Sequence, residues 1–114
     1  MKAEDTEMAI ACDWLDAKGF DGCYFHVPNE GKRSPRTGKR LKRIGMRRGV
    51  PDMHVIRRTP RGAPGIVWEM KKPGGPKPTK HQLAWLEHYE NEGWVTGWGP
   101  AFDFIELVEE TYGV

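Results

Sequence analysis

Apolar positions recur at helical spacing near the start of the chain and predict a helix over residues 3–18. Its apolar side consists of four residues: Ile10, Ala11, Trp14 and Leu15. Gly19 is a typical stop for such a helix. Glu4 and Glu7 fall on the same side, which is unusual for carboxylates. Either they lie there because the helix dipole favours acids in a first turn, or they serve a function.

Short runs rich in β-branched and aromatic residues predict the strands. Residues 23–27 form the first run. The runs 53–57 and 65–70 flank a segment with turn residues, 58–64, and therefore predict a hairpin. Residues 94–98 predict one more strand.

Two further helices complete the pattern. Thr79 is expected to cap a helix that runs to Glu92, with Gln82 three residues on in the capping-box position. Residues 100–111 predict an acidic terminal helix. The order α-β-β-β-α-β-α indicates a mixed α/β protein, and the length of 114 residues indicates one domain covering residues 1–114.

The segment from Glu30 to Gly49 breaks the pattern, because it is rich in Gly, Lys and Arg and has almost no apolar positions. Such a segment cannot bury a face, so we expect a loop without regular structure until it binds a ligand.

Charge is strongly segregated along the chain. The net charge is only +2, yet twelve basic residues and a single acidic one lie between Gly31 and Arg61. This middle part therefore carries +11 and the rest of the chain −9. A polyanionic partner that contacts this one segment is the predicted consequence.

Composition excludes several other classes. Hydrophobic residues make up 38% of the chain, enough for a small core, so disorder throughout is excluded. We expect no membrane-spanning helix and no signal peptide, because the apolar runs are short. Cys12 and Cys23 form no disulfide framework. These features predict a cytoplasmic protein of a bacterium or a phage-infected cell.

The predicted hairpin brings charged residues together. Opposite residues of antiparallel strands have a constant sum of residue numbers, and the midpoint of Asp52 and Glu69 falls inside the predicted turn. Lys71 lies two residues after Glu69 and therefore on the same face. Opposed carboxylates weaken a hairpin, whereas Mg²⁺ would bind their oxygens together with a backbone carbonyl, that of Met70. Charged hairpins are also common without a metal, so both interpretations stand on spacing alone.

These residues resemble a known nuclease signature. Pro51-Asp52 followed by Glu69-Met70-Lys71 is similar to the PD-(D/E)XK signature. A longer string resembles the VRR-NUC branch of that superfamily: Asn29, Arg48-Gly49-Val50-Pro51-Asp52, Glu69 to Gly75, Pro78-Thr79, Gln82, Trp85-Leu86 and Gly93. The resemblance implies an α/β fold with a restriction-endonuclease-like core, in which helices flank a mixed β-sheet with a metal-binding β-hairpin.

The resemblance also implies a role for each matching residue. The catalytic residues would be Asp52, Glu69, Lys71 and Gln82. The ligands of Mg²⁺ or Mn²⁺ would be Asp52, Glu69, the carbonyl of Met70 and, from the first helix, Glu7. Glu4 is the alternative to Glu7, and Gln82 can also complete its helix cap.

The implied activity is metal-dependent hydrolysis of DNA phosphodiester bonds in replication, repair or recombination, leaving a 5′-phosphate and a 3′-hydroxyl. Ten basic residues are expected to hold the nucleic acid by phosphate contacts: Lys32, Arg33, Arg36, Lys39, Arg40, Lys42, Arg43, Arg47, Arg48 and Lys72. The chain is similar to stand-alone phage and bacterial members that resemble Holliday-junction resolvases, which implies branched DNA and a homodimer. A non-catalytic nucleic-acid-binding module of the same fold and an accessory subunit of a replication or repair assembly are the alternatives.

Overall fold

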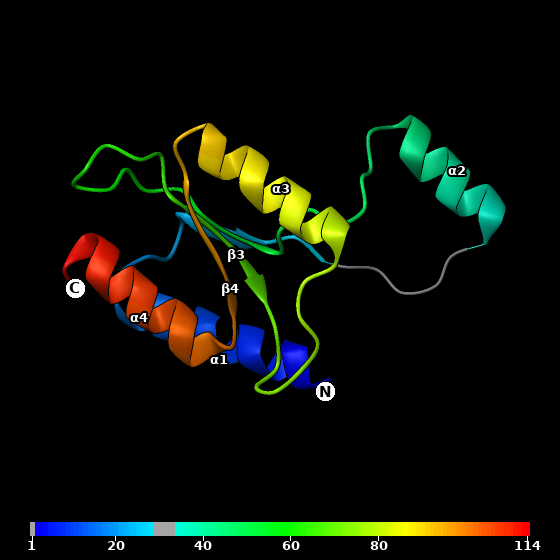
Figure 1. The fold of residues 1–114 in the computed structure, drawn as a ribbon. Coiled ribbons are helices and arrows are strands. Elements are labelled where there is room, and N and C mark those ends of the chain that lie inside the picture. Colours follow the sequence, from blue (N-terminus) through cyan, green and yellow to red (C-terminus); the bar gives the residue numbers. More distant parts are fainter. Residues whose placement is uncertain (1, 29–33) are drawn as a thin grey trace.

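A four-stranded mixed sheet flanked by helices forms the body of the protein in the computed structural model, which describes residues 2–28 and 34–114 (Figure 1). The strands, in sheet order, are β1 (Tyr24–His26), β2 (Met53–Val55), β3 (Ile66–Met70) and β4 (Val95–Gly99). The pairs β1–β2 and β2–β3 are antiparallel, and β4 runs parallel to β3. Each predicted strand is therefore confirmed, with bounds that differ by one or two residues.

Three of the helices also match the prediction, namely α1 (Ala3–Ala17), α3 (Lys80–Asn91) and α4 (Ala101–Tyr112). The predicted capping box at the start of α3 is present. The Thr79 side chain accepts a hydrogen bond from the Gln82 backbone N–H at 3.2 Å, and the Gln82 Oε1 accepts one from the Thr79 N–H at 2.8 Å.

The prediction of a loop without regular structure after Glu30 is wrong for its central part, which forms helix α2 (Pro35–Arg43). No residue of α2 is buried, so the apolar pattern contains no signal for this helix. Its stabilisation is local. The Ser34 side chain accepts a hydrogen bond from the Thr37 N–H, Pro35 occupies the first turn, and the basic residues of the last turn face the negative end of the helix dipole.

The hairpin register is as predicted. Met53 lies opposite Trp68, and the same register continued by one residue puts Asp52 opposite Glu69. The backbone N–H of Val27 donates to the Asp52 carbonyl at 2.7 Å, so β1 holds this end of the hairpin from the other side.

The two faces of the sheet have different partners. Ile66, Trp68 and Met70 point to one face and pack in a core with α1 and α4. Their neighbours Val67 and Glu69 alternate to the opposite face, which α3 covers. A carboxylate is thus buried between the sheet and α3. Among the described residues, no helix combines the length and apolar character needed to cross a membrane.

Candidate active site

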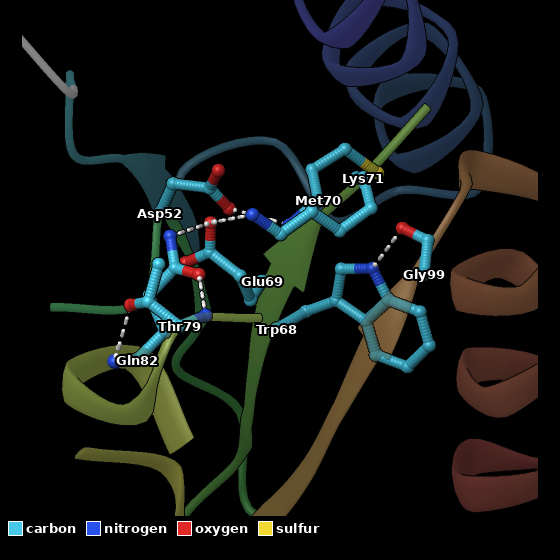
Figure 2. Close-up of polar contacts among 8 residues, drawn as sticks. All are labelled: Asp52, Trp68, Glu69, Met70, Lys71, Thr79, Gln82 and Gly99. Atoms are coloured by element: carbon cyan, nitrogen blue, oxygen red, sulfur yellow. Dashed lines mark hydrogen bonds and ion pairs between the residues drawn. The ribbon is translucent and has the colours of Figure 1, made fainter. Parts of the chain in front are cut away.

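The end of the hairpin gathers two carboxylates and an ammonium group (Figure 2). Glu69 is only 3% exposed, and its Oε2 lies 4.0 Å from the Nζ of Lys71, which is also buried. Asp52, just before β2, accepts a hydrogen bond at its Oδ1 from the Met70 N–H at 2.9 Å. The three side chains that the sequence predicts to converge are therefore brought together.

Gln82 joins this cluster from α3. Its Nε2 donates to Glu69 Oε2 at 3.0 Å, while its Oε1 accepts from Thr79 as part of the capping box. One side chain thus fixes both the start of α3 and the orientation of the Glu69 carboxylate. Both interpretations of Gln82 hold together.

The carboxylates are held in an unfavourable environment. Burial, reinforced by the negative charges of Asp52 and Glu4, raises the pKa of Glu69 to about 8 despite the nearby Lys71. Burial and the charge of Glu4 raise the pKa of Asp52 to about 6, although the Met70 N–H and Lys71 lower it. A perturbed acid pair beside a lysine is typical of functional sites.

The donor chemistry of this pair fits a hard divalent cation. Each carboxylate has one oxygen engaged by an N–H donor, Met70 for Asp52 and Gln82 for Glu69, which leaves the other oxygen of each group free of that donor. A cation between them would offset the burial that raises both pKa values and the repulsion from Asp52 that raises the pKa of Glu69 further. Within residues 2–28 and 34–114, however, His, Cys, Asp and Glu side chains form no group of three or more placed to hold a metal ion.

Glu7 has a different partner from the expected one. Its Oε1 accepts a hydrogen bond at 2.8 Å from the Ala101 N–H, at the first turn of α4. The residue before that helix, Pro100, offers no side-chain cap of its own. Glu4 is instead the acid of α1 whose charge acts on both Asp52 and Glu69.

We expect Glu7→Ala to lower the free energy of unfolding by about 1 kcal/mol, because the first turn of α4 loses its carboxylate cap. Chemical denaturation measures this change. Glu4→Ala is the matched control and should leave stability nearly unchanged, since Glu4 is exposed. Equal destabilisation by the two substitutions would contradict the assigned cap.

The predicted nucleic-acid-binding residues divide into groups. Lys42, Arg47 and Arg48 line a cleft of about 950 Å³ between α2 and the body, together with His81 and Gln82. Four others are exposed on α2 outside this cleft: Arg36, Lys39, Arg40 and Arg43. Lys72 is exposed just after the hairpin, and Lys32 and Arg33 lie outside the described residues.

Side-chain hydrogen bonds to backbone carbonyls hold the cleft in shape. The Trp85 Nε1 donates to the Arg48 carbonyl at 3.1 Å and thereby ties α3 to the segment after α2. The Arg47 guanidinium donates to the carbonyls of Lys42 and Met46, both at 2.9 Å, and so closes the C-terminal end of α2. The sequence contains no pattern that predicts these contacts, or the place of His81 in the cleft.

Gly49 lies where the segment after α2 crosses the start of α3. It has a φ of +82°, and a Cβ there would lie 2.8 Å from two His81 atoms and 2.9 Å from the Gln82 nitrogen. We expect Gly49→Ala to displace the start of α3, and with it Gln82, and to lower the melting temperature. Gly62→Ala is the control for backbone strain alone, because Gly62 has a φ of +94° with nothing within 4 Å of its Cβ position. If both variants lowered the melting temperature equally, the close packing at Gly49 would add nothing to the strain of its positive φ.

The mixed sheet, its acidic hairpin and the covering helix together define an α/β fold with a pair of carboxylates at one end of the hairpin. The comparisons with known proteins agree with this class. A solved structure described as a VRR_NUC domain protein matches with a TM-score of 0.76 and 21% sequence identity, over 97% of this chain and 88% of that one. No protein-family model matches the chain, and no curated protein matches it either. The chain therefore has the fold of a VRR_NUC domain, as the motif resemblance implies.

Proposed function

We propose that this protein is a metal-dependent deoxyribonuclease that hydrolyses phosphodiester bonds. The observation that carries the proposal is the convergence of Asp52, Glu69 and Lys71 beside Gln82, a residue that also lines the basic cleft. A solvated charge cluster has no need to bury two acids whose pKa values are raised by burial. The fold similarity supports the same chemistry.

The proposed ligands of Mg²⁺ or Mn²⁺ are Asp52, Glu69 and the backbone carbonyl of Met70. Glu4, rather than Glu7, would be the additional acid and would act on the cation through water, because Glu7 caps α4 and Glu4 forms no three-acid group with Asp52 and Glu69 although its charge acts on both. When bound, the cation supplies neutralisation of charge on the phosphate and a lower pKa for the attacking water.

The other residues of the proposed site orient the attacking water, the Glu69 carboxylate and the DNA backbone. Lys71 carries its ammonium to the face where Glu69 lies, so it can orient the attacking water and stabilise negative charge that develops on the phosphate. Gln82 holds the Glu69 carboxylate in one orientation through its 3.0 Å hydrogen bond. Lys42 and Arg48 line the cleft beside Gln82 and would hold the DNA backbone without reading its bases.

Cleavage of end-labelled DNA tests the proposal. The purified protein is mixed with a four-way junction, a flap, a plain duplex and a single strand, each with Mg²⁺, with Mn²⁺ or with EDTA. We expect cleavage with either metal and none with EDTA, and the rates across the panel report whether branched DNA is preferred. Sedimentation of the same preparation tests the proposed homodimer. Binding without cleavage under every condition would favour the non-catalytic binding module instead.

A further inference from the structure

Helix α2 presents two different surfaces. Gly38, Leu41 and Lys42 line the cleft that leads to Gln82. The four other basic residues of α2 have the spacing i, i+3, i+4 and i+7, which places them on one common face, away from the cleft: Arg36, Lys39, Arg40 and Arg43. We call this set the outer face of α2. All four of its side chains are exposed, and the helix contains no acidic residue to neutralise them.

The cleft is too small for a duplex. Its volume of about 950 Å³ equals that of a cube about 10 Å on a side. The two grooves of B-DNA are about 8.5 and 7.5 Å deep, so a duplex is at least about 16 Å across. A single strand therefore fits the cleft, where it can run along Lys42 and Arg48 toward Gln82 and the Glu69 carboxylate.

The outer face suits a regular array of phosphates. Seven residues of helix rise by about 10 Å, and one strand of duplex DNA carries a phosphate about every 3.4 Å along the axis, so about three phosphates match the length of the basic row. Helix α2 also stands away from the sheet, which lets DNA approach it without meeting the body of the protein (Figure 1). A strand in the cleft cannot reach this face at the same time, because the helix lies between them.

We propose that the outer face of α2 binds the backbone of a DNA duplex while the adjoining single strand passes through the cleft. The helix then separates the two at a junction between duplex and single-stranded DNA. This inference rests on the proposed function, because it names the DNA form that the same site receives. It assigns duplex binding and single-strand binding to different basic residues of one segment of the sequence.

Binding measured in EDTA tests the two surfaces without any cleavage. The outer-face variant combines Arg36→Gln, Lys39→Gln, Arg40→Gln and Arg43→Gln, and the cleft variant combines Lys42→Gln with Arg48→Gln. Each is titrated with a fluorescent single strand, a blunt duplex, and a duplex with a single-stranded tail, over a range of salt concentrations. We expect the outer-face variant to bind the duplex and the tailed duplex at least about 30-fold more weakly. The slope of log affinity against log salt concentration should become smaller in magnitude by roughly 3 to 4. Its affinity for the single strand should change less than twofold, whereas the cleft variant should show the reverse preference.

Two controls separate charge from side-chain identity and from position. Replacing the three outer-face arginines by lysine keeps the charges and should keep duplex binding within a few-fold. Arg58→Gln with Arg61→Gln removes two charges from the β2–β3 connection, far from α2, and should change none of the affinities (Figure 1). If the fourfold variant fails to fold, the four single variants give the same comparison, each with a slope change of about 0.9.

The inference is overturned if the outer-face variant weakens single-strand and duplex binding equally, since the basic residues then form one undivided patch. It is also overturned if the variant leaves duplex binding unchanged or if the unaltered protein binds no duplex. The proposed nuclease activity is measured separately, with metal present, so its failure would leave a binding protein with the same two surfaces.

Discussion

Lys71→Met is expected to lower kcat for DNA cleavage by about 10³-fold while the protein stays folded. The Lys71 side chain is 10% exposed and carries the ammonium that lies beside Glu69 Oε2. Methionine keeps most of the apolar stem and removes the charge that would orient water and stabilise the phosphate. Single-turnover cleavage with saturating enzyme separates this loss of chemistry from any loss of binding.

A matched control uses another lysine of the same chain. Lys18→Met removes one positive charge after the end of α1, away from the carboxylate pair, and should leave both kcat and KM unchanged. Lys72→Met changes the exposed neighbour of Lys71 and should act mainly through KM, because Lys72 would only contact the DNA backbone. A Lys71→Met variant with undiminished kcat would remove Lys71 from the reaction and leave it as a partner that only balances the charge of Glu69.

The part of the site on the hairpin could be predicted from the sequence, because the residue numbers indicate which positions of two antiparallel strands lie opposite each other. The position of the turn sets the register of two antiparallel strands, so the numbers of Asp52 and Glu69 already place them opposite each other to within a residue or two. Alternation along the strand then places Lys71 with them. Gln82 was predictable for a similar reason, since the capping box fixes the start of its helix.

The other features of the site depend on tertiary packing and on local helix caps, which leave no periodic pattern in the sequence. Glu4 and Glu7 are almost one turn apart, and the packing of α1 against α4 decides which of them reaches the Ala101 N–H. Helix α2 has no buried residue, so its signals are only the Ser34 cap, Pro35 and the basic last turn. Apolar spacing therefore cannot predict a helix that is stabilised locally and exposes its charges to solvent.

Helix α2 and the hairpin therefore differ in how they accommodate charged side chains. The hairpin buries charges in a rigid frame of backbone hydrogen bonds, where an unsatisfied carboxylate destabilises the fold unless a counter-ion is present. The helix leaves its charges fully in water, where they cost little stability and attract a polyanion over a distance. The proposed function would thus divide recognition and chemistry between an exposed element and a buried one.

The second large expected effect concerns this burial: Glu69→Gln should stabilise the metal-free protein at alkaline pH while abolishing cleavage. The pKa of Glu69 is about 8 in the folded protein and near 4.5 for a free glutamate. A folded state with the higher pKa binds the proton more tightly than the unfolded state does. The contribution of Glu69 is therefore most favourable below about pH 4.5 and is lost progressively as the pH rises through 8. Glutamine has no charge to desolvate and keeps an oxygen for the Gln82 amide.

Thermal unfolding in EDTA between pH 5 and pH 9 measures the effect. We expect the variant to match the unaltered protein near pH 5 and to exceed it by up to about 5 kcal/mol at pH 9, because the pKa of Glu69 rises from 4.5 to about 8 on folding. Its melting temperature at pH 9 should be higher by at least about 5 °C. Glu87→Gln makes the same chemical change at an exposed position of α3 and should shift neither value. Millimolar Mg²⁺ should raise the melting temperature of the unaltered protein much more than that of Glu69→Gln, because the variant loses one of the two charged ligands of the cation. If Glu69→Gln were no more stable than the unaltered protein at pH 9, Lys71 would already neutralise the Glu69 carboxylate. The electrostatic argument for a cation between Asp52 and Glu69 would then be wrong.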